Sequence, residues 1–360
     1  MTKEINYAYS ISEHPLISEH PLYESLMSSN LKNFHINNDG SFENLSLIPT
    51  YYKYIPKPHC VIIEDYVTIF FPHIHNGSNY KFNKDASFLP KYKQLFLDTN
   101  FRGVICHMKQ TLDSLSYLFD GEIDNKLHYL DLAYDSPIKE IKKTNRDKIV
   151  LTFTNSFGGS SANFNFRGGI ESLIAYRELY ENGYTNLYLN LTGNIEVEPS
   201  LKSWLEVCDN VNIHTADIIR HDRPILSEEK IHNVIKGTDI FLIPSCRIHS
   251  MSIVRALCYG SIVIGSDGWG FDEFVNEQYC CKGQSYSTYI EDNLLKEKYS
   301  LSLISPNYEL KDSIKNKILH IINSDMDKIK EKSLVESQER FNKNKRDENF
   351  EKILEKATND

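Results

Sequence analysis

The residues best suited to chemistry are two arginines, a histidine and a glutamate in loops rich in glycine and serine. They are Arg167 at the end of NSFGGSSANFNFR, Arg247 and His249 in PSCRIHS, and Glu273 at the end of SDGWGFDE. An arginine carries a fixed positive charge and a fork of N–H donors that matches phosphate oxygens. These residues therefore predict a site for a phosphate-bearing ligand.

Each of the three loops runs into a segment with the pattern of a helix. Glycine lets a backbone approach a phosphate closely, and the N–H groups at a helix start attract anions. The predicted ligand contacts are Asn155, Ser156, Arg167, Gly168, Ser245, Ser250, Met251, Ser252, Arg255, Gly268, Trp269 and Gly270. A flexible surface loop explains the first loop as well, and Arg255 can point toward the ligand or outward from its helix.

The elements around these loops alternate between strand and helix. Strand patterns fall at 148–155, 186–193, 210–216, 239–245 and 262–267, and helix patterns at 169–183, 200–208, 227–237, 250–259 and after Gly270. Ser227 is a predicted N-cap, and Gly237 a predicted helix end. This alternation indicates a parallel, doubly wound sheet, which binds ligands at the carboxyl ends of its strands, where all three loops fall.

The first part of the chain has a looser pattern of the same kind, with strands predicted at 60–65, 103–107 and 126–134. Glu64 and Asp65 end the first of these strands, and His107 ends the second. The strand-end rule makes these three residues candidates for contacts with a second substrate. Each of them can equally be a surface or capping residue.

Two other segments bear on domain organisation. The hexapeptide ISEHPL occurs twice in a row at 11–22, which is too short for a solenoid repeat and indicates a local duplication in an N-terminal arm. The polar, lysine-rich stretch 139–148 is a candidate linker. At 360 residues the chain is long enough for two domains.

Composition excludes several classes of protein. A net charge of -9 disfavours a protein that works by neutralising nucleic-acid phosphates. The seven cysteines contain no CxxC pair, which favours reduced thiols in a cytoplasmic protein and no metal site. The N-terminus lacks the apolar core of a signal peptide. Lysines mixed with aromatic residues at 81–102 fit peripheral contact with the inner face of an anionic membrane, or a partly buried helix with a basic face.

The run IPSCRIHSMSIVRALCYGSIVIGSDGWGFDEFV at 243–275 resembles a motif block of the retaining glycosyltransferases of family 4, also called group 1. That block has a strand, Pro-Ser, Glu-x7-Glu, Ala-x-x-x-Gly and Gly-Gly-x-x-Glu. Arg167 and Gly168 stand where the family has Lys-Gly, and Gly193 stands at its second-strand glycine. The resemblance covers about residues 148–280. At the two glutamate positions of the family this chain has Arg247 and Arg255, which implies a variant donor pocket.

The resemblance implies an α/β fold of the GT-B type, in which two Rossmann-like domains with parallel doubly wound sheets face a cleft. Residues 1–145 would form the acceptor domain with the N-terminal arm, and 146–335 the nucleotide-sugar domain. The charged helix at 336–360 would pack back on the first domain.

The resemblance also implies sugar transfer from a UDP-, GDP- or ADP-sugar to a glycan, lipid-linked or protein hydroxyl, with retention and without a metal or other cofactor. Arg167, Arg247 and His249 would stabilise the leaving diphosphate, and Glu273 would bind sugar hydroxyls. The arginine pair also fits a non-catalytic relative that binds a nucleotide or glycan. A dinucleotide-dependent oxidoreductase is disfavoured because no GxGxxG follows the strand at 148–155.

Overall fold

The structure, a computed structural model, describes residues 3–7, 21–37, 45–49, 55–70, 84–155, 164, 167–192, 195, 197, 199–220, 223–245, 248–283 and 306–359. The chain divides into two compact units. The N-terminal unit includes Met1–Asp135 and Arg340–Asp360, and the C-terminal unit includes Ser136–Tyr286 and Glu297–Glu339.

The C-terminal unit is built on a six-stranded sheet in the order β14-β13-β12-β7-β8-β9, in which every paired neighbour is parallel. Its strands are β7 (Ile149–Thr154), β8 (Leu187–Thr192), β9 (Val211–His214), β12 (Ile240–Leu242), β13 (Ile262–Ser266) and β14 (Cys280–Cys281). A short antiparallel hairpin of β10 (Ile218–Arg220) and β11 (Arg223–Ile225) follows β9. This order is that of a Rossmann sheet, whose direction of winding reverses between β7 and β12.

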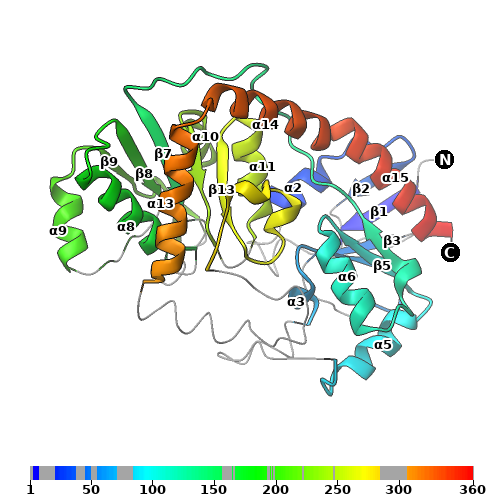
Figure 1. The fold of residues 1–360 in the computed structure, drawn as a ribbon. Coiled ribbons are helices and arrows are strands. Elements are labelled where there is room, and N and C mark those ends of the chain that lie inside the picture. Colours follow the sequence, from blue (N-terminus) through cyan, green and yellow to red (C-terminus); the bar gives the residue numbers. More distant parts are fainter. Residues whose placement is uncertain are drawn as a thin grey trace. The chain divides into compact units, whose positions relative to one another are not determined.

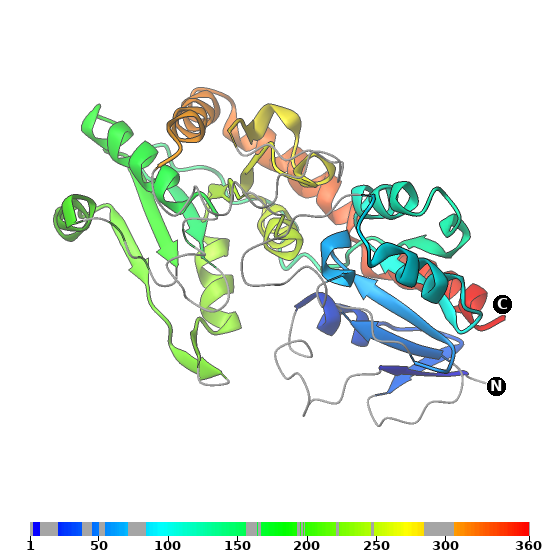
Figure 2. The same cartoon turned by 90° about the horizontal axis from the view of Figure 1, so that it is seen from below.

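Helices cover both faces of this sheet. They are α8 (Gly169–Glu181), α9 (Pro199–Val207), α10 (Glu228–Lys236), α11 (Ser250–Cys258), α13 (Tyr308–Ile322) and α14 (Met326–Arg340). Figures 1 and 2 show α8 and α13 on one face, and α10 and α11 on the other. On α8 the buried Leu173, Tyr176 and Leu179 recur at helical spacing. Burying each such side chain stabilises the fold by about 1.5–3 kcal/mol.

The N-terminal unit contains a second six-stranded parallel sheet, in the order β2-β1-β3-β4-β5-β6. Its strands are β1 (Lys3–Tyr7), β2 (Phe34–Asn37), β3 (Leu45–Pro49), β4 (His59–Ile63), β5 (Phe101–Cys106) and β6 (Leu127–Tyr129). Its helices are α2 (Pro21–Met27), α3 (Tyr66–Ile69), α5 (Leu89–Leu97), α6 (Lys109–Leu118), a 3-10 turn η1 (Asp124–Lys126) and α15 (Lys343–Asn359). The C-terminal helix α15 packs against β5, and the Tyr134 N–H donates to the Phe341 carbonyl at 3.0 Å.

The structure differs from the sequence expectations in three places. Strands β1, β2 and β3 precede the first predicted strand. Strand β6 ends at Tyr129, five residues before the predicted strand did. The helix expected after Gly270 is a single 3-10 turn, η2 (Phe271–Glu273), followed by a second, η3 (Glu277–Tyr279). Most of the ISEHPL duplication lies outside the described residues.

The segment with mixed lysines and aromatic residues forms the partly buried helix α5. Tyr92 and Phe96 are buried, and Lys93 pairs with Glu122 at 2.6 Å. Packing and ion pairing therefore account for the described part of this segment. Among the described residues no helix is long and apolar enough to cross a membrane.

Candidate functional site

The reversal between β7 and β12 brings two of the predicted loops to the same edge of the C-terminal sheet. Where the strand order reverses, the connections from two neighbouring strands lead away in opposite directions. They leave a crevice at the carboxyl ends of the two strands, where α/β proteins bind ligands. Asn155 follows β7, and Ser245 lies three residues beyond β12. The Asn155 N–H donates to the carbonyl and hydroxyl oxygens of Thr192, both at 3.2 Å, which ties the start of the first loop to β8.

Arg167 and His249 meet at this edge. Arg167 Nη2 lies 3.2 Å from His249 Nδ1, and the arginine is 7% exposed. A guanidinium has only donors, so Nδ1 must be the acceptor. The geometry therefore fixes a neutral imidazole with its proton on Nε2. The Arg167 guanidinium and the Nε2–H group of His249 are thus two donors close to the start of α11. This arrangement suits an anion.

Two glycines at the start of α8 allow close packing against the first and second loops. Gly168 has a φ of +73°, and a Cβ there would lie 2.7 Å from the Pro244 carbonyl oxygen. A Cβ on Gly169 would lie 2.5 Å from the ring of Phe164. Gly168 requires glycine for packing as well as for the backbone angle, and Gly169 requires it for packing. The structure thus supplies a reason for these glycines that does not depend on a ligand.

The start of α11 uses some of its own polar groups. Ser250 is buried, and Met251 is 8% exposed. The Ser252 N–H donates to the His249 carbonyl at 3.0 Å, so this amide, expected to face a ligand, is engaged within the helix. The N–H groups of Ser250 and Met251 remain the predicted anion donors of this turn.

The loops after β12 and β13 are joined through Ser266. Its hydroxyl donates to the Ser245 carbonyl at 2.5 Å and accepts the Gly268 N–H at 3.0 Å. Trp269 is buried, and Gly270 has a φ of +84°. This turn carries Glu273, which is half-buried at the end of η2.

Arg255 contacts a residue that the sequence did not indicate. Its Nη2 lies 2.8 Å from Glu228 Oε2 at the start of α10, and its side chain is 12% exposed. The direction left open by the sequence is therefore toward α10. The last turn of α11 here meets the first turn of α10. The ion pair therefore depends on how the two helices pack, which no local sequence pattern encodes.

On the N-terminal unit, the structure brings together two of the three candidates. His107 Nε2 lies 3.7 Å from Glu64 Oε1, and the histidine is 4% exposed. Asp65 has a capping role: its Oδ1 accepts the N–H and the hydroxyl of Thr68, both at 3.0 Å, at the start of α3. Ser156 and Arg247 lie outside the described residues.

The sequence matches no family model and no curated protein. The structure is similar to solved structures of other proteins, including two bacterial proteins whose sequence identity to this chain is low. One is the pneumococcal O-GlcNAc transferase GtfA with UDP and GlcNAc, at 13% identity and a TM-score of 0.53, covering 88% of this chain and 57% of that one. Another is a Staphylococcus aureus TarM variant with fondaparinux, α-GlcNAc-glycerol and UDP, at 12% identity and a TM-score of 0.51, covering 86% of this chain and 55% of that one.

A third structure matches along almost its whole length. The Anabaena protein HepE, solved with UDP and glucose, has a TM-score of 0.58 at 10% identity, covering 98% of this chain and 99% of that one. The chain spans just over half the length of GtfA and TarM. At such identities the likeness defines the fold. Together with the two parallel Rossmann-like sheets, it confirms the expected GT-B fold.

Proposed function

We propose that this protein is a glycosyltransferase that moves a sugar from a nucleotide-sugar donor to a hydroxyl of an acceptor. The observation that carries the proposal is the pairing of Arg167 with His249 at the carboxyl edge of the C-terminal sheet. The GT-B fold and the glycosyltransferases among its structural neighbours support it. Because three of those neighbours were solved with UDP, a UDP-sugar is the first donor to test.

The donor diphosphate would lie against Arg167 and the N–H groups of Ser250 and Met251. As the bond between the sugar C1 and the phosphate oxygen breaks, negative charge grows on the leaving diphosphate. Donors fixed in a partly buried site stabilise that charge without reorganising. Arg167 is held in place by its bond to His249, so its guanidinium is oriented before the donor binds.

The acceptor oxygen forms the new bond to C1, and its proton passes to the departing phosphate. Retention at C1, independence of metals and hexosyl transfer complete the proposal, with Glu273 binding sugar hydroxyls. Glu64 and His107 are the proposed acceptor contacts on the N-terminal unit. A glycan, lipid-linked or protein hydroxyl is the proposed acceptor class, in polysaccharide biosynthesis or a related pathway.

The experiment is hydrolysis of a UDP-sugar without acceptor, measured with the Arg167→Ala variant beside wild type. Loss of a charged donor to a phosphate costs about 1.5–3 kcal/mol, so UDP affinity should fall at least tenfold. Lys202→Ala removes an exposed cation on α9 and is the matched control. Unchanged UDP affinity and turnover in Arg167→Ala would remove the residue from the diphosphate site.

The second candidate is a non-catalytic relative that binds a nucleotide or glycan. Arg255, at a position where transferases of the resembling family carry a glutamate, is joined to Glu228. A basic side chain held in an ion pair provides no acceptor for ribose hydroxyls. Binding of UDP with no hydrolysis across UDP-, GDP- and ADP-sugars would favour this candidate.

A further inference from the structure

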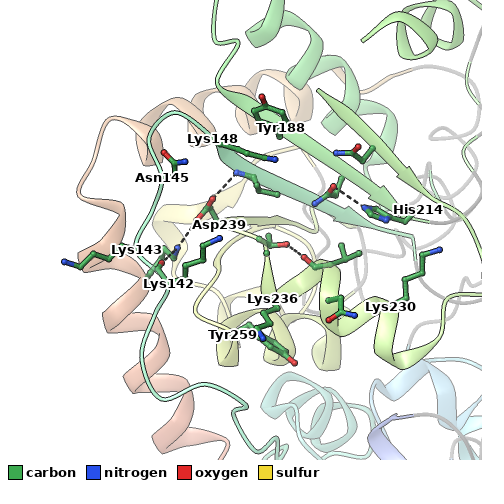
Figure 3. Close-up of a pocket in the computed structure, with 18 residues that line it drawn as sticks. Lys142, Lys143, Asn145, Lys148, Tyr188, His214, Lys230, Lys236, Asp239 and Tyr259 are labelled. Carbon is green, nitrogen blue, oxygen red and sulfur yellow. Dashed lines mark hydrogen bonds and ion pairs between the residues drawn. The ribbon is translucent and has the colours of Figure 1, made fainter. Parts of the chain in front are cut away.

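The C-terminal unit has a pocket whose lining contains none of the donor-site candidates. Its volume is about 480 Å³, and it lies on the sheet face that carries α10 (Figure 3). It is lined by residues of the segment before β7, of β7, β8, β9, α10 and α14, and by Tyr259. This volume is within the range of sites for small molecules, roughly 300–1,000 Å³.

The pocket is strongly basic. Six lysines line it, against a single carboxylate among its described lining residues, Asp239: they are Lys142, Lys143, Lys148, Lys230, Lys236 and Lys330. Lys330 is 3% exposed and pairs with Asp239 at 2.8 Å, while the other Asp239 oxygen accepts the Val150 N–H at 3.0 Å. That pair is structural and neutral, so five lysines supply the charge of the pocket.

Nearby acids do not cancel this charge. Asp327 caps the Thr144 N–H at 2.8 Å, and the same bond is the main cause that lowers the pKa of Asp327. Asp217 bonds Ser227, which lowers its pKa, and it also feels the charge of Lys230. Neither aspartate lines the pocket. The only carboxylate among the described lining residues, Asp239, is paired with Lys330, so the other five lysines leave an excess of positive charge in the lining.

Lysines stand at both ends of the pocket, and Lys236 lies between them (Figure 3). In Figure 3, Lys142 and Lys148 lie at one end and Lys230 and His214 at the other. Lys148 Nζ stands 4.6 Å from the centre of the Tyr188 ring. Asn190 also lines the pocket, and its Oδ1 lies 3.1 Å from His214 Nε2. A ligand that satisfies both ends must carry more than one anionic group.

The cationic groups of this pocket suit phosphate. None of the described residues that line the pocket is an arginine, so its charge comes from lysines. A lysine ammonium group binds phosphate as a point charge, without the planar fork by which arginine binds phosphate and carboxylate alike. Asn212 and Asn233 add amide groups to the lining, and Tyr259 adds a second aromatic ring, which are groups that bind the hydroxyls and faces of a sugar. We propose that this pocket is an accessory binding site for a bisphosphorylated sugar.

The site is independent of the proposed transferase activity. Its lining shares no residue with the loops that carry Arg167 and His249. Nucleotide bound at the carboxyl edge of the sheet should therefore leave it open. Competition between the two ligands distinguishes the pocket from the donor site.

The test measures binding of fructose 1,6-bisphosphate by calorimetry, with glucose 6-phosphate and glucose for comparison. Three pocket lysines are changed together, Lys142→Gln, Lys148→Gln and Lys230→Gln. The matched control changes three exposed lysines outside the pocket, Lys202→Gln, Lys328→Gln and Lys332→Gln, and so alters the net charge equally. Circular dichroism establishes that both variants fold.

The bisphosphate should bind wild type at least about tenfold more tightly than the monophosphate, since a second charge-assisted contact is made. The pocket variant should lose at least about thirty-fold in affinity, and the control less than about threefold. The ring resonances of His214 should shift on binding in wild type, and excess UDP should not displace the bisphosphate. Equal losses in both variants, displacement by UDP, or no binding at millimolar concentration would each overturn the proposal.

Discussion

Arg167 donates from Nη2 to His249 Nδ1 at 3.2 Å, and this bond links the loop before α8 to the N-cap residue of α11. The two side chains come from positions 82 residues apart in the chain. The bond makes a testable claim about the histidine. Its ring must act as an acceptor, so a replacement that keeps an acceptor should keep Arg167 oriented.

We therefore expect His249→Leu to weaken UDP binding about tenfold, since the arginine loses its orienting partner. His249→Asn retains a side-chain oxygen and should remain within about threefold of wild type. Calorimetric titration with UDP measures both. Equal losses of UDP affinity in the two variants would indicate that the histidine influences UDP binding through an interaction other than this hydrogen bond.

Gly168 should be intolerant of any side chain. Its φ of +73° costs an L-residue about 1–2 kcal/mol, and an added Cβ would stand 2.7 Å from the Pro244 oxygen. Gly168→Ala should lower the free energy of unfolding by about 2–4 kcal/mol in total and weaken UDP binding with it. Urea unfolding and UDP titration measure the two effects.

Gly183 provides the matched control for that variant. It has a φ of +95°, but a Cβ there would meet nothing within 4 Å. Gly183→Ala should therefore show the cost of the backbone angle alone, about 1–2 kcal/mol, with unchanged UDP affinity. If both alanine variants lose the same free energy of unfolding, the contact with Pro244 contributes nothing to the cost of Gly168→Ala.

The ion pair between Arg255 and Glu228 should fasten α11 to α10 with little influence on the donor. Glu228 is 51% exposed, so solvent screens the pair and its loss should cost no more than about 1 kcal/mol. Arg255→Met should thus destabilise modestly and leave the Kd for UDP within about twofold. Arg255→Glu should cost more, because two carboxylates then face each other.

The exchange Arg255→Glu with Glu228→Arg restores opposite charges and should recover most of the stability lost in Arg255→Glu. Thermal unfolding of the three variants gives the comparison. A tenfold loss of UDP affinity in Arg255→Met would show instead that the arginine reaches the donor.

The sequence predicted the sheet of the C-terminal unit well because its strands are largely apolar runs, such as IVLTFT in β7. Amphipathic helices with clear ends separate these strands. Ser227 caps α10 as predicted, accepting the Lys230 N–H at 3.3 Å. The first strands were not predicted because β1 reads KEINY and β2 reads FHIN, short runs with charged or polar residues. They join the sheet through the pairing of β2 with β1 and of β1 with β3.

The meeting of two candidate residues was predictable to the extent that it depends on topology. Arg167 and His249 lie in the loops that follow β7 and β12, and parallel strands bring such loops to one edge of the sheet. Glu228 and the lysine pocket were not predictable in the same way. Lys148, Lys230 and Lys330 come from three separate elements, and residues 139–148 had the composition of a linker. Which side chains line one cavity depends on helix packing, which leaves no periodic signal in the sequence.

Glu171 should make stability depend on pH in an unusual direction. It is buried in the first turn of α8, and burial is the main cause that raises its pKa, although the Asn307 N–H bonds to its Oε1 at 2.8 Å. A carboxyl whose pKa is higher in the folded state favours folding below its unfolded pKa, near 4.3, and this contribution is lost as the pH rises through the folded value. Glu171→Gln keeps an oxygen for Asn307 and carries no charge. The variant should therefore be more stable than wild type at pH 7, with a difference that shrinks toward pH 4.

Glu178, on the same helix, should behave oppositely and serves as the control. Burial acts most strongly on its pKa and would raise it, but the bonds to Lys311 and Lys315 together lower the pKa. Its contribution is present above the unfolded pKa and is lost as the pH falls through the folded one. Glu178→Gln should thus lose stability at pH 7 and approach wild type under acid. Thermal unfolding of both variants and wild type from pH 4 to pH 7 tests both predictions. If the two variants differ from wild type in the same direction at pH 7, the assignment of a buried charge to Glu171 is refuted.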